Sequence, residues 1–203
     1  MTAARRPAER PAGALWRALE AASGHALSVA GWCFLAMTLL ICFDIVARRM
    51  LGFSPGATSE LSGYLLGTGM SWGLAAALVE RAHVRIDMLV QRLPLGARVW
   101  LHLAALLVLL VVAGFFAWGA ASLAIDSWQL RATDISQLRT PLVVPQALWA
   151  AGFALFVVVA LALGARALLA LARGRKVEVD AMLVARSYEE EAAESIDASR
   201  EAR

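Results

Sequence analysis

Four long runs of apolar residues follow one another along the chain, separated by short polar segments. Each run is near or above the roughly 20 residues that a helix needs to cross the hydrocarbon core of a bilayer. A helix satisfies its own backbone hydrogen bonds in that core, which an irregular segment cannot do. The pattern therefore predicts an all-α membrane protein with four transmembrane helices, at about 26–47, 61–79, 99–125 and 142–171.

The polar segments at the two ends set the boundaries of this membrane domain, which we place at 25–172. Residues 1–24 begin with prolines and arginines and end with apolar residues at helical spacing, which predicts a short amphipathic helix on the inner leaflet. Residues 173–203 are rich in charge, so we expect this tail to be solvated and only transiently helical from Val177 onward.

The connection between the second and third runs has an amphipathic pattern of its own. Four of its apolar residues fall within one arc of about 100° on a helical projection: Ile86, Leu89, Val90 and Leu93. This arc predicts a short helix, from about 84 to 93, that lies along the membrane surface. An ordinary positively charged loop would explain the arginines of this connection but not the arc. On the surface, four arginines would contact anionic headgroups, each contributing about 1 kcal/mol: Arg81, Arg85, Arg92 and Arg98.

The composition agrees with a membrane protein and excludes an ordinary soluble domain. Of the 203 residues, 60% are hydrophobic and only 17% are charged, and the charged residues crowd into the two ends. A net charge of +3 would favour a nucleic-acid partner only if the basic residues formed one patch. They are instead spread over the segments that flank the runs, so we expect no nucleic-acid partner.

The distribution of basic residues predicts the orientation. Lysine and arginine number four in residues 1–25, four in the second connection and seven from Arg166 onward, against four in the first and third connections together. Because the flanks richer in Lys and Arg stay in the cytoplasm, both termini and the second connection are predicted to be cytoplasmic.

Small residues recur every four positions in the second run. Two neighbouring stripes of glycine, continued by Ala77, lie on one side of the predicted helix, and small residues at this spacing let a second helix approach closely in lipid. We therefore predict that this side faces protein, which is either another span of this chain or a partner. The glycines are Gly63, Gly67, Gly69 and Gly73.

Charged residues near the ends of the first two runs have structural explanations. Asp44 and Arg48 are four residues apart, so they share one helix face, and we favour an interfacial ion pair between them over a role in transport. Glu60 follows a predicted Thr or Ser cap in the first turn of the second span, where the helix dipole favours a carboxylate.

The chain lacks the residues that the commonest membrane activities need. No glycine-rich phosphate loop is present, and the three histidines, His25, His83 and His102, form no facing pair that would ligate a haem. None of the four runs holds an acidic residue near its centre, which weighs against an exporter driven by a buried carboxylate. We therefore expect a scaffold subunit without catalytic residues, cofactor or metal. The alternative is a free-standing four-helix membrane anchor or redox subunit.

Two stretches resemble the small membrane subunit, the DctQ-type component, of tripartite ATP-independent periplasmic (TRAP) transporters. The first, "AHVRIDMLVQRLP", contains His83 and Asp87 and is similar to a segment that follows the family's second span. The second, "FDIVARRMLGFSPGATSEL", has Asp44, Arg48 or Arg49, Pro55 and Glu60 in the family's order and approximate spacing, and Tyr64 follows. This chain lacks the tryptophan that often lies between the proline and the glutamate, and it has Gly63 where an arginine is common.

The resemblance implies a transporter subunit rather than an enzyme. Its partners would be a large DctM-type membrane subunit, which moves the solute, and a periplasmic DctP-type binding protein, which delivers it. The transporter would import an organic acid with an ion gradient, usually sodium, across the bacterial inner membrane. The small subunit would be a stationary scaffold that also contacts membrane lipids.

Overall fold

The computed structural model describes residues 13–53, 56–81, 90, 93–136 and 138–184. Apart from one isolated bridge between Thr133 and Pro141, the regular structure of these residues is helical, as predicted. The elements are α1 (Ala14–Val46), a π-helical end to it, η1 (Ala47–Leu51), α2 (Thr58–Val79), α4 (Leu95–Gln129), α5 (Val143–Ala172) and α6 (Lys176–Leu183).

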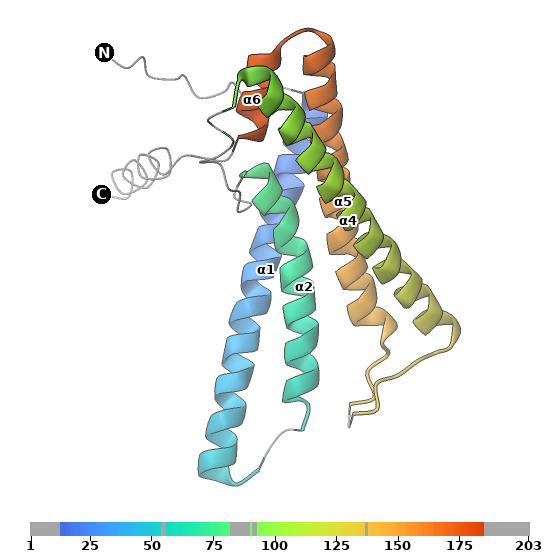
Figure 1. Cartoon of the computed structure of the whole chain (residues 1–203). Helices are drawn as coiled ribbons and strands as arrows, with labels where there is room; N and C mark the ends of the chain where they lie inside the picture. Colours follow the sequence, from blue (N-terminus) through green and yellow to red (C-terminus); the bar gives the residue numbers. More distant parts are fainter. Residues whose placement is uncertain (1–12, 54–55, 82–89, 91–92, 137, 185–203) are drawn as a thin grey trace, which may run out of the picture.

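The four long helices lie side by side in a row (Figure 1). α1 packs on α2, α2 packs on α5, and α5 packs on α4, so the main order in space is α1–α2–α5–α4; α1 also makes a smaller contact with α5. Short α6 contacts α4 and α5 at one end of the row, which we call the α6 end. The opposite end, where the connection between α4 and α5 lies, is called the loop end. α1 and α4 diverge toward the loop end (Figure 1).

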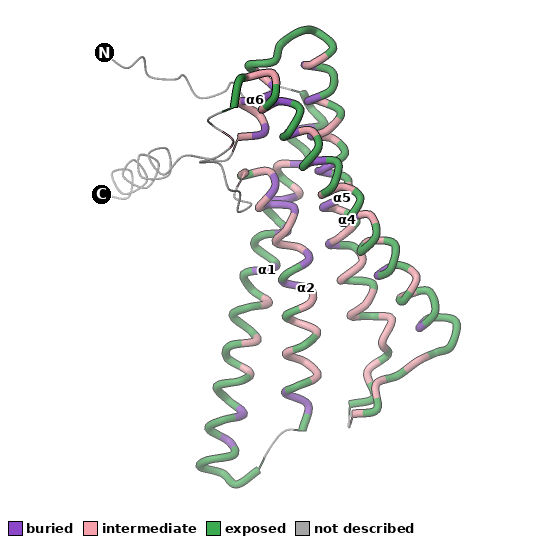
Figure 2. The backbone as a smooth tube through the Cα atoms, in the orientation of Figure 1, coloured by how far each residue is buried: buried purple, intermediate pink, exposed green. Residues whose placement is uncertain are grey.

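Burial is uneven along this row (Figure 2). In the most apolar stretch of α5, 33% of the residues are buried, against 11% in α1, because α5 has neighbours on both sides. A continuous hydrophobic cluster joins α1, α2, α4, α5 and α6, and includes Trp16, Leu78, Val99, Ala170 and Val179. The outer members of the row leave many large apolar side chains exposed, among them Trp32, Leu39, Val111, Phe115 and Trp118.

Three of the four predicted spans have the length and composition of membrane-crossing helices: Ala14–Leu51, Leu95–Gln129 and Val143–Ala172. α2 is long enough, at 22 residues, but it is less apolar than these three because its sequence contains four glycines and several serines and threonines. The all-α prediction is therefore confirmed with three candidate spans, and a membrane-crossing α2 stays a prediction.

The two ends of the chain differ from the sequence prediction. Residues 14–24, expected as a separate short helix, are the first part of α1 and continue into it without a break. The tail was expected to be solvated from Val177, but α6 is a packed helix in which Val179, Asp180 and Leu183 are buried. Periodicity over eight residues is too short a signal to reveal such a helix, and the high charge of the tail as a whole predicted a solvated segment.

A tight turn between α5 and α6 explains how α6 reaches the bundle. Gly174 has a φ of 72°, and its N–H donates to the carbonyl of Leu171 at 2.9 Å, while the N–H of Arg175 donates to Ala170 at 3.0 Å. These two bonds form a Schellman motif, in which a glycine in the left-handed conformation ends the helix. The chain therefore reverses sharply and directs α6 back against α4 and α5.

Candidate functional site

Among the glycines that the structure describes, Gly152 of α5 has the least room for a side chain, at the place where α2 meets α5. A Cβ atom at this position would lie 2.4 Å from Ser71 Oγ, 2.6 Å from Trp72 Cδ1 and 2.8 Å from the carbonyl carbon of Ser71. The indole Nε1 of Trp72 donates a hydrogen bond to the carbonyl oxygen of Leu148, one turn earlier in α5, at 2.7 Å. Gly152 thus lets the Trp72 ring reach a backbone carbonyl of α5. Sequence analysis missed Gly152 because it is an isolated glycine with no partner glycine at a spacing of four.

The glycines of α2 divide into two pairs with different neighbours. A Cβ at Gly69 would lie 3.2 Å from the Phe34 ring and 3.4 Å from Cys33 Cβ, and one at Gly73 would lie 3.8 Å from Ala30 Cβ. These two glycines therefore face α1. A Cβ at Gly63 or Gly67 would meet nothing within 4 Å, so close packing against another span of this chain does not explain them.

Gly63 and Gly67 instead line an open apolar groove between α2 and α5. Its volume is about 380 Å³, and its other walls are Leu66, Met70, Ser71, Leu74, Trp149 and Phe153. The exposed fractions of Leu66 and Met70, 42% and 59%, show that the groove opens toward the surroundings. Because Gly63 and Gly67 have no side chains, they leave space that forms part of the groove.

A polar cluster at the loop end joins the start of α2 to the α4–α5 connection. The Tyr64 hydroxyl lies 2.9 Å from Glu60 Oε1 and 2.7 Å from Asp134 Oδ2, and it donates its single proton to one or the other carboxylate. The Ser136 hydroxyl donates to Glu60, and the Ser136 N–H donates to Asp134 Oδ1 at 3.0 Å. Ala57, not Thr or Ser, is the N-cap of α2, and it makes no side-chain capping bond. Glu60 therefore holds a loop in place, in addition to its expected position in the first turn.

The Tyr64 hydrogen bond also lowers the pKa of Asp134, with a smaller contribution from the Ser136 N–H. A carboxyl group whose pKa is lower in the folded state stabilises the fold above its ordinary pKa, about 3.9. That contribution is lost as the pH falls through the lowered value. The attachment of the loop is thus expected to survive moderate acid and to fail in strong acid.

Replacing Tyr64 with Phe is expected to loosen the α4–α5 connection, because both carboxylates lose their shared donor. Hydrogen exchange at the amides of Asp134 and Leu142, which bond to Thr140 and Ala132, should accelerate by about tenfold. The acid transition of the loop should also move up toward the ordinary aspartate pKa. Thr38→Val, which removes a hydroxyl bonded within α1, is the matched control. Equal exchange in wild type and Tyr64→Phe would contradict this account.

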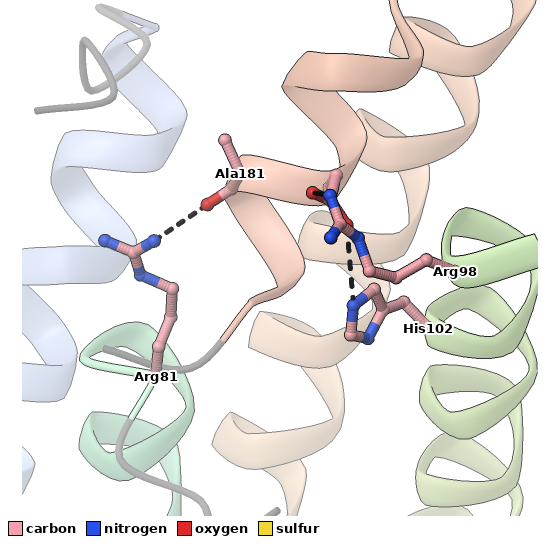
Figure 3. A network of polar contacts seen from close by, with 5 residues as sticks. Arg81, Arg98, His102 and Ala181 are labelled. Atoms are coloured by element: carbon pink, nitrogen blue, oxygen red, sulfur yellow. Dashed lines mark hydrogen bonds and ion pairs between the residues drawn. The ribbon is translucent and has the colours of Figure 1, made fainter. Parts of the chain in front are cut away.

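A second polar cluster lies at the α6 end (Figure 3). Arg98 donates to both carboxylate oxygens of Asp180, with its Nε 2.6 Å from Oδ1, and His102 Nε2 lies 3.6 Å from Oδ1 of the same carboxylate. Arg81, at the end of α2, donates from Nη1 to the carbonyl oxygen of Ala181 at 2.7 Å. Arg81 and Arg98 therefore bind α6, and their expected contact with lipid headgroups stays a prediction. Neither contact could be predicted from local spacing in the sequence, because the two bonds join residues about 80 to 100 positions apart.

The other predicted positions have mixed outcomes. The ion pair between Asp44 and Arg48 is present; the Asp44 side chain is only 2% exposed and that of Arg48 is 61% exposed, as expected for a pair at a helix end. In the predicted surface helix only Val90 and Leu93 are described, and the Leu93 N–H donates to the Val90 carbonyl at 3.1 Å. The remaining positions lie outside the described residues: Pro55, His83, Arg85, Ile86, Asp87, Leu89 and Arg92.

The described residues do not form an obvious reaction centre. No group of three His, Cys, Asp or Glu side chains among them could hold a metal ion. The two polar clusters join helices and loops to one another, and the open groove is apolar. This arrangement suits packing and assembly.

Comparison with known proteins identifies the family. Neither the curated proteins nor the solved structures gave a match to this chain. Residues 37–170, about two thirds of the chain, match the family model described as "Tripartite ATP-independent periplasmic transporters, DctQ component". This is a family of transporter components rather than of enzymes. The chain therefore belongs to the DctQ family, the small membrane component of TRAP transporters.

Proposed function

We propose that this protein is the scaffold subunit of an importer and has neither a solute site nor an ion site of its own. A large DctM-type membrane subunit would move the solute, and a periplasmic DctP-type binding protein would deliver it. The solute would be an organic acid, and the driving force an ion gradient, most simply that of sodium. Family membership of residues 37–170 carries the proposal. The single row of helices also supports it. In a single row, other helices of this chain do not enclose α2 and α5 on all sides, so a partner subunit has room to pack on them.

The proposed setting is the bacterial inner membrane, with α2 as a fourth span beside the three apolar helices. Four crossings would leave both termini on the same side, and the arginine counts favour the cytoplasm for that side. The α6 end would then face the cytoplasm and the loop end the periplasm. Membership of a membrane-transporter family and the packing of α2 between α1 and α5 support this arrangement.

The groove between α2 and α5 is the proposed contact with the large subunit. Its apolar walls suit side chains from a membrane helix, and Gly63 and Gly67 would let that helix approach closely. Asp44, Arg48 and Glu60 would keep structural roles. Asp44 pairs with Arg48, and Glu60 accepts from Tyr64 and Ser136, all within this chain.

Uptake by reconstituted subunits tests the proposed function. Vesicles would contain this chain alone, the large subunit alone, or both, with purified binding protein and a panel of organic acids outside. Uptake that needs both membrane subunits and responds to a sodium gradient is expected. Uptake by this chain alone would overturn the scaffold role, and full uptake by the large subunit alone would show that the chain is dispensable.

The surface helix between α2 and α4 is a further expected feature. Single cysteines at each position from 84 to 93 should show a helical period of labelling, with positions 86, 89, 90 and 93 protected from aqueous thiol reagents and quenched from the lipid phase. Protection should exceed that of the exposed positions by roughly tenfold. Uniform aqueous labelling would mean that the stretch is an ordinary loop.

A further inference from the structure

The short helix α6 packs on α4 and α5 at the α6 end, and Arg81, just beyond the end of α2, bonds to it. Its hydrophobic face, Val179 and Leu183, is buried in the cluster that also contains Trp16 of α1, Leu78 of α2 and Val99 of α4. These two side chains are 0% and 2% exposed. An eight-residue helix is too short to be stable alone in water, so this packing is what keeps α6 folded.

Polar contacts fix the register of α6 on the bundle. Asp180 accepts two hydrogen bonds from Arg98 of α4, and the side chains of the two residues are only 7% and 18% exposed. A bidentate arginine–carboxylate pair fixes both distance and orientation. Since the pair is largely buried, removal of one partner would leave the other charge without compensation. His102, 5% exposed and one turn further along α4, lies against the same carboxylate.

α2 is connected to α6 by an arginine in an unfavourable conformation. Arg81 follows the end of α2 with a φ of 59°, a left-handed conformation that costs a residue with a Cβ atom free energy. Its guanidinium donates to the carbonyl of Ala181, which lies in the last turn of α6 and lacks a partner within that helix. A cation at this end of α6 is also favoured by the helix dipole.

α1 is connected to the same place through α5. The Arg166 guanidinium lies 4.1 Å above the Trp16 ring, and its Nη2 lies 3.9 Å from the Met182 sulfur of α6. The Trp16 indole donates in turn to Glu20 at 2.7 Å. Arg166 therefore touches α1 and α6 at once, and the start of α1 is tied to α6 by this residue.

We propose that α6 is a clamp that fixes the positions of the four long helices relative to one another at the α6 end. The clamp acts through the Arg98–Asp180 pair, the Arg81–Ala181 bond and the packing of Val179 and Leu183. It lies beyond the residues that match the family, so it goes beyond the scaffold role that family membership supports. The chain alone is enough to test it, without the partners of the proposed importer.

A distance measurement in the full chain tests the clamp. Spin labels would be attached at Leu15→Cys on α1 and Leu101→Cys on α4, both exposed and near the α6 end, with Cys33 and Cys42 replaced by Ala. In lipid vesicles the labelled protein should give one narrow distance distribution. Asp180→Asn should broaden it and shift it to longer distances, and the melting temperature should fall by on the order of 10 °C.

Two further variants complete the test. Lys176→Gln is the matched control, since Lys176 is on the same helix, is exposed and also loses one charge in the change; it should leave distances and melting unchanged. If Asp180→Asn does not fold, the same distances are measured in Arg98→Lys, which keeps the charge but not the bidentate geometry and should also broaden the distribution. A folded Asp180→Asn or Arg98→Lys protein with an unchanged distance distribution would overturn the clamp.

Discussion

Gly152→Ala is expected to separate α2 from α5 and to destabilise the bundle more than an alanine at any other helical glycine that the structure describes. The added Cβ would lie within 2.4–2.8 Å of Ser71 and Trp72, and because one of the atoms it meets is a backbone carbon, a change of rotamer cannot remove the clash. The helices would move apart, and the Trp72–Leu148 hydrogen bond would lengthen. We expect a loss of about 3 kcal/mol from overpacking and the weakened bond together.

Unfolding in mixed micelles, followed by tryptophan fluorescence, measures this loss. Gly164→Ala in the same helix is the matched control, since its Cβ would make an ordinary contact, 3.6 Å from Leu106 Cδ2. Both variants remove a glycine from a helix, which by itself favours the helix by up to about 1 kcal/mol. A Gly152→Ala protein as stable as Gly164→Ala would show that α2 and α5 do not meet at this position.

Gly67→Leu is expected to leave the chain folded but to weaken its association with the large subunit at least tenfold. A Cβ at Gly67 meets nothing within 4 Å in this chain, so the larger side chain fills the groove without displacing α2. If a partner helix enters that groove, the leucine separates the two helices and removes their packing energy, and a tenfold loss corresponds to about 1.4 kcal/mol.

Co-purification of the two membrane subunits, with a tag on the large one, measures this effect. Gly31→Leu on α1 is the control, because its Cβ also meets nothing within 4 Å but lies away from the groove. Melting of the isolated chain should be the same for both variants. Normal co-purification of Gly67→Leu would place the large subunit on another surface.

Helices were the part of the fold that the sequence predicted best. Long apolar runs are unambiguous because few structures other than a membrane helix require them, and α4 and α5 lie where those runs lie. The start of α1 was misplaced, since residues 14–24 carry both charged and apolar side chains and look like a surface helix. In the structure Trp16 and Leu19 are buried, and the contact of Trp16 with Arg166 could not be anticipated from local periodicity.

The candidate site was predictable only where partners are one turn apart. Asp44 and Arg48 fulfil that condition, and their pair is present. Tyr64 and Glu60 fulfil it as well, but Asp134 and Ser136 come from a loop 70 and 76 residues away. Of the glycine stripe, Gly69 and Gly73 lie against α1. Gly152, which has the least room for a Cβ atom among the described glycines, has no partner glycine four residues away, and a single glycine in a membrane helix is too common to be a signal.

Because the four long helices form one row, much of the surface of α1 and α4 is constrained only to be apolar. Positions such as Trp32, Leu39, Val111 and Phe115 are exposed, and any large apolar side chain there meets the same requirement. Over evolutionary time such positions should drift among Leu, Val, Ile and Phe, while Gly152, Trp72 and Asp180 should change little. Sequence identity between related subunits would then fall quickly, even though their helices keep the same arrangement.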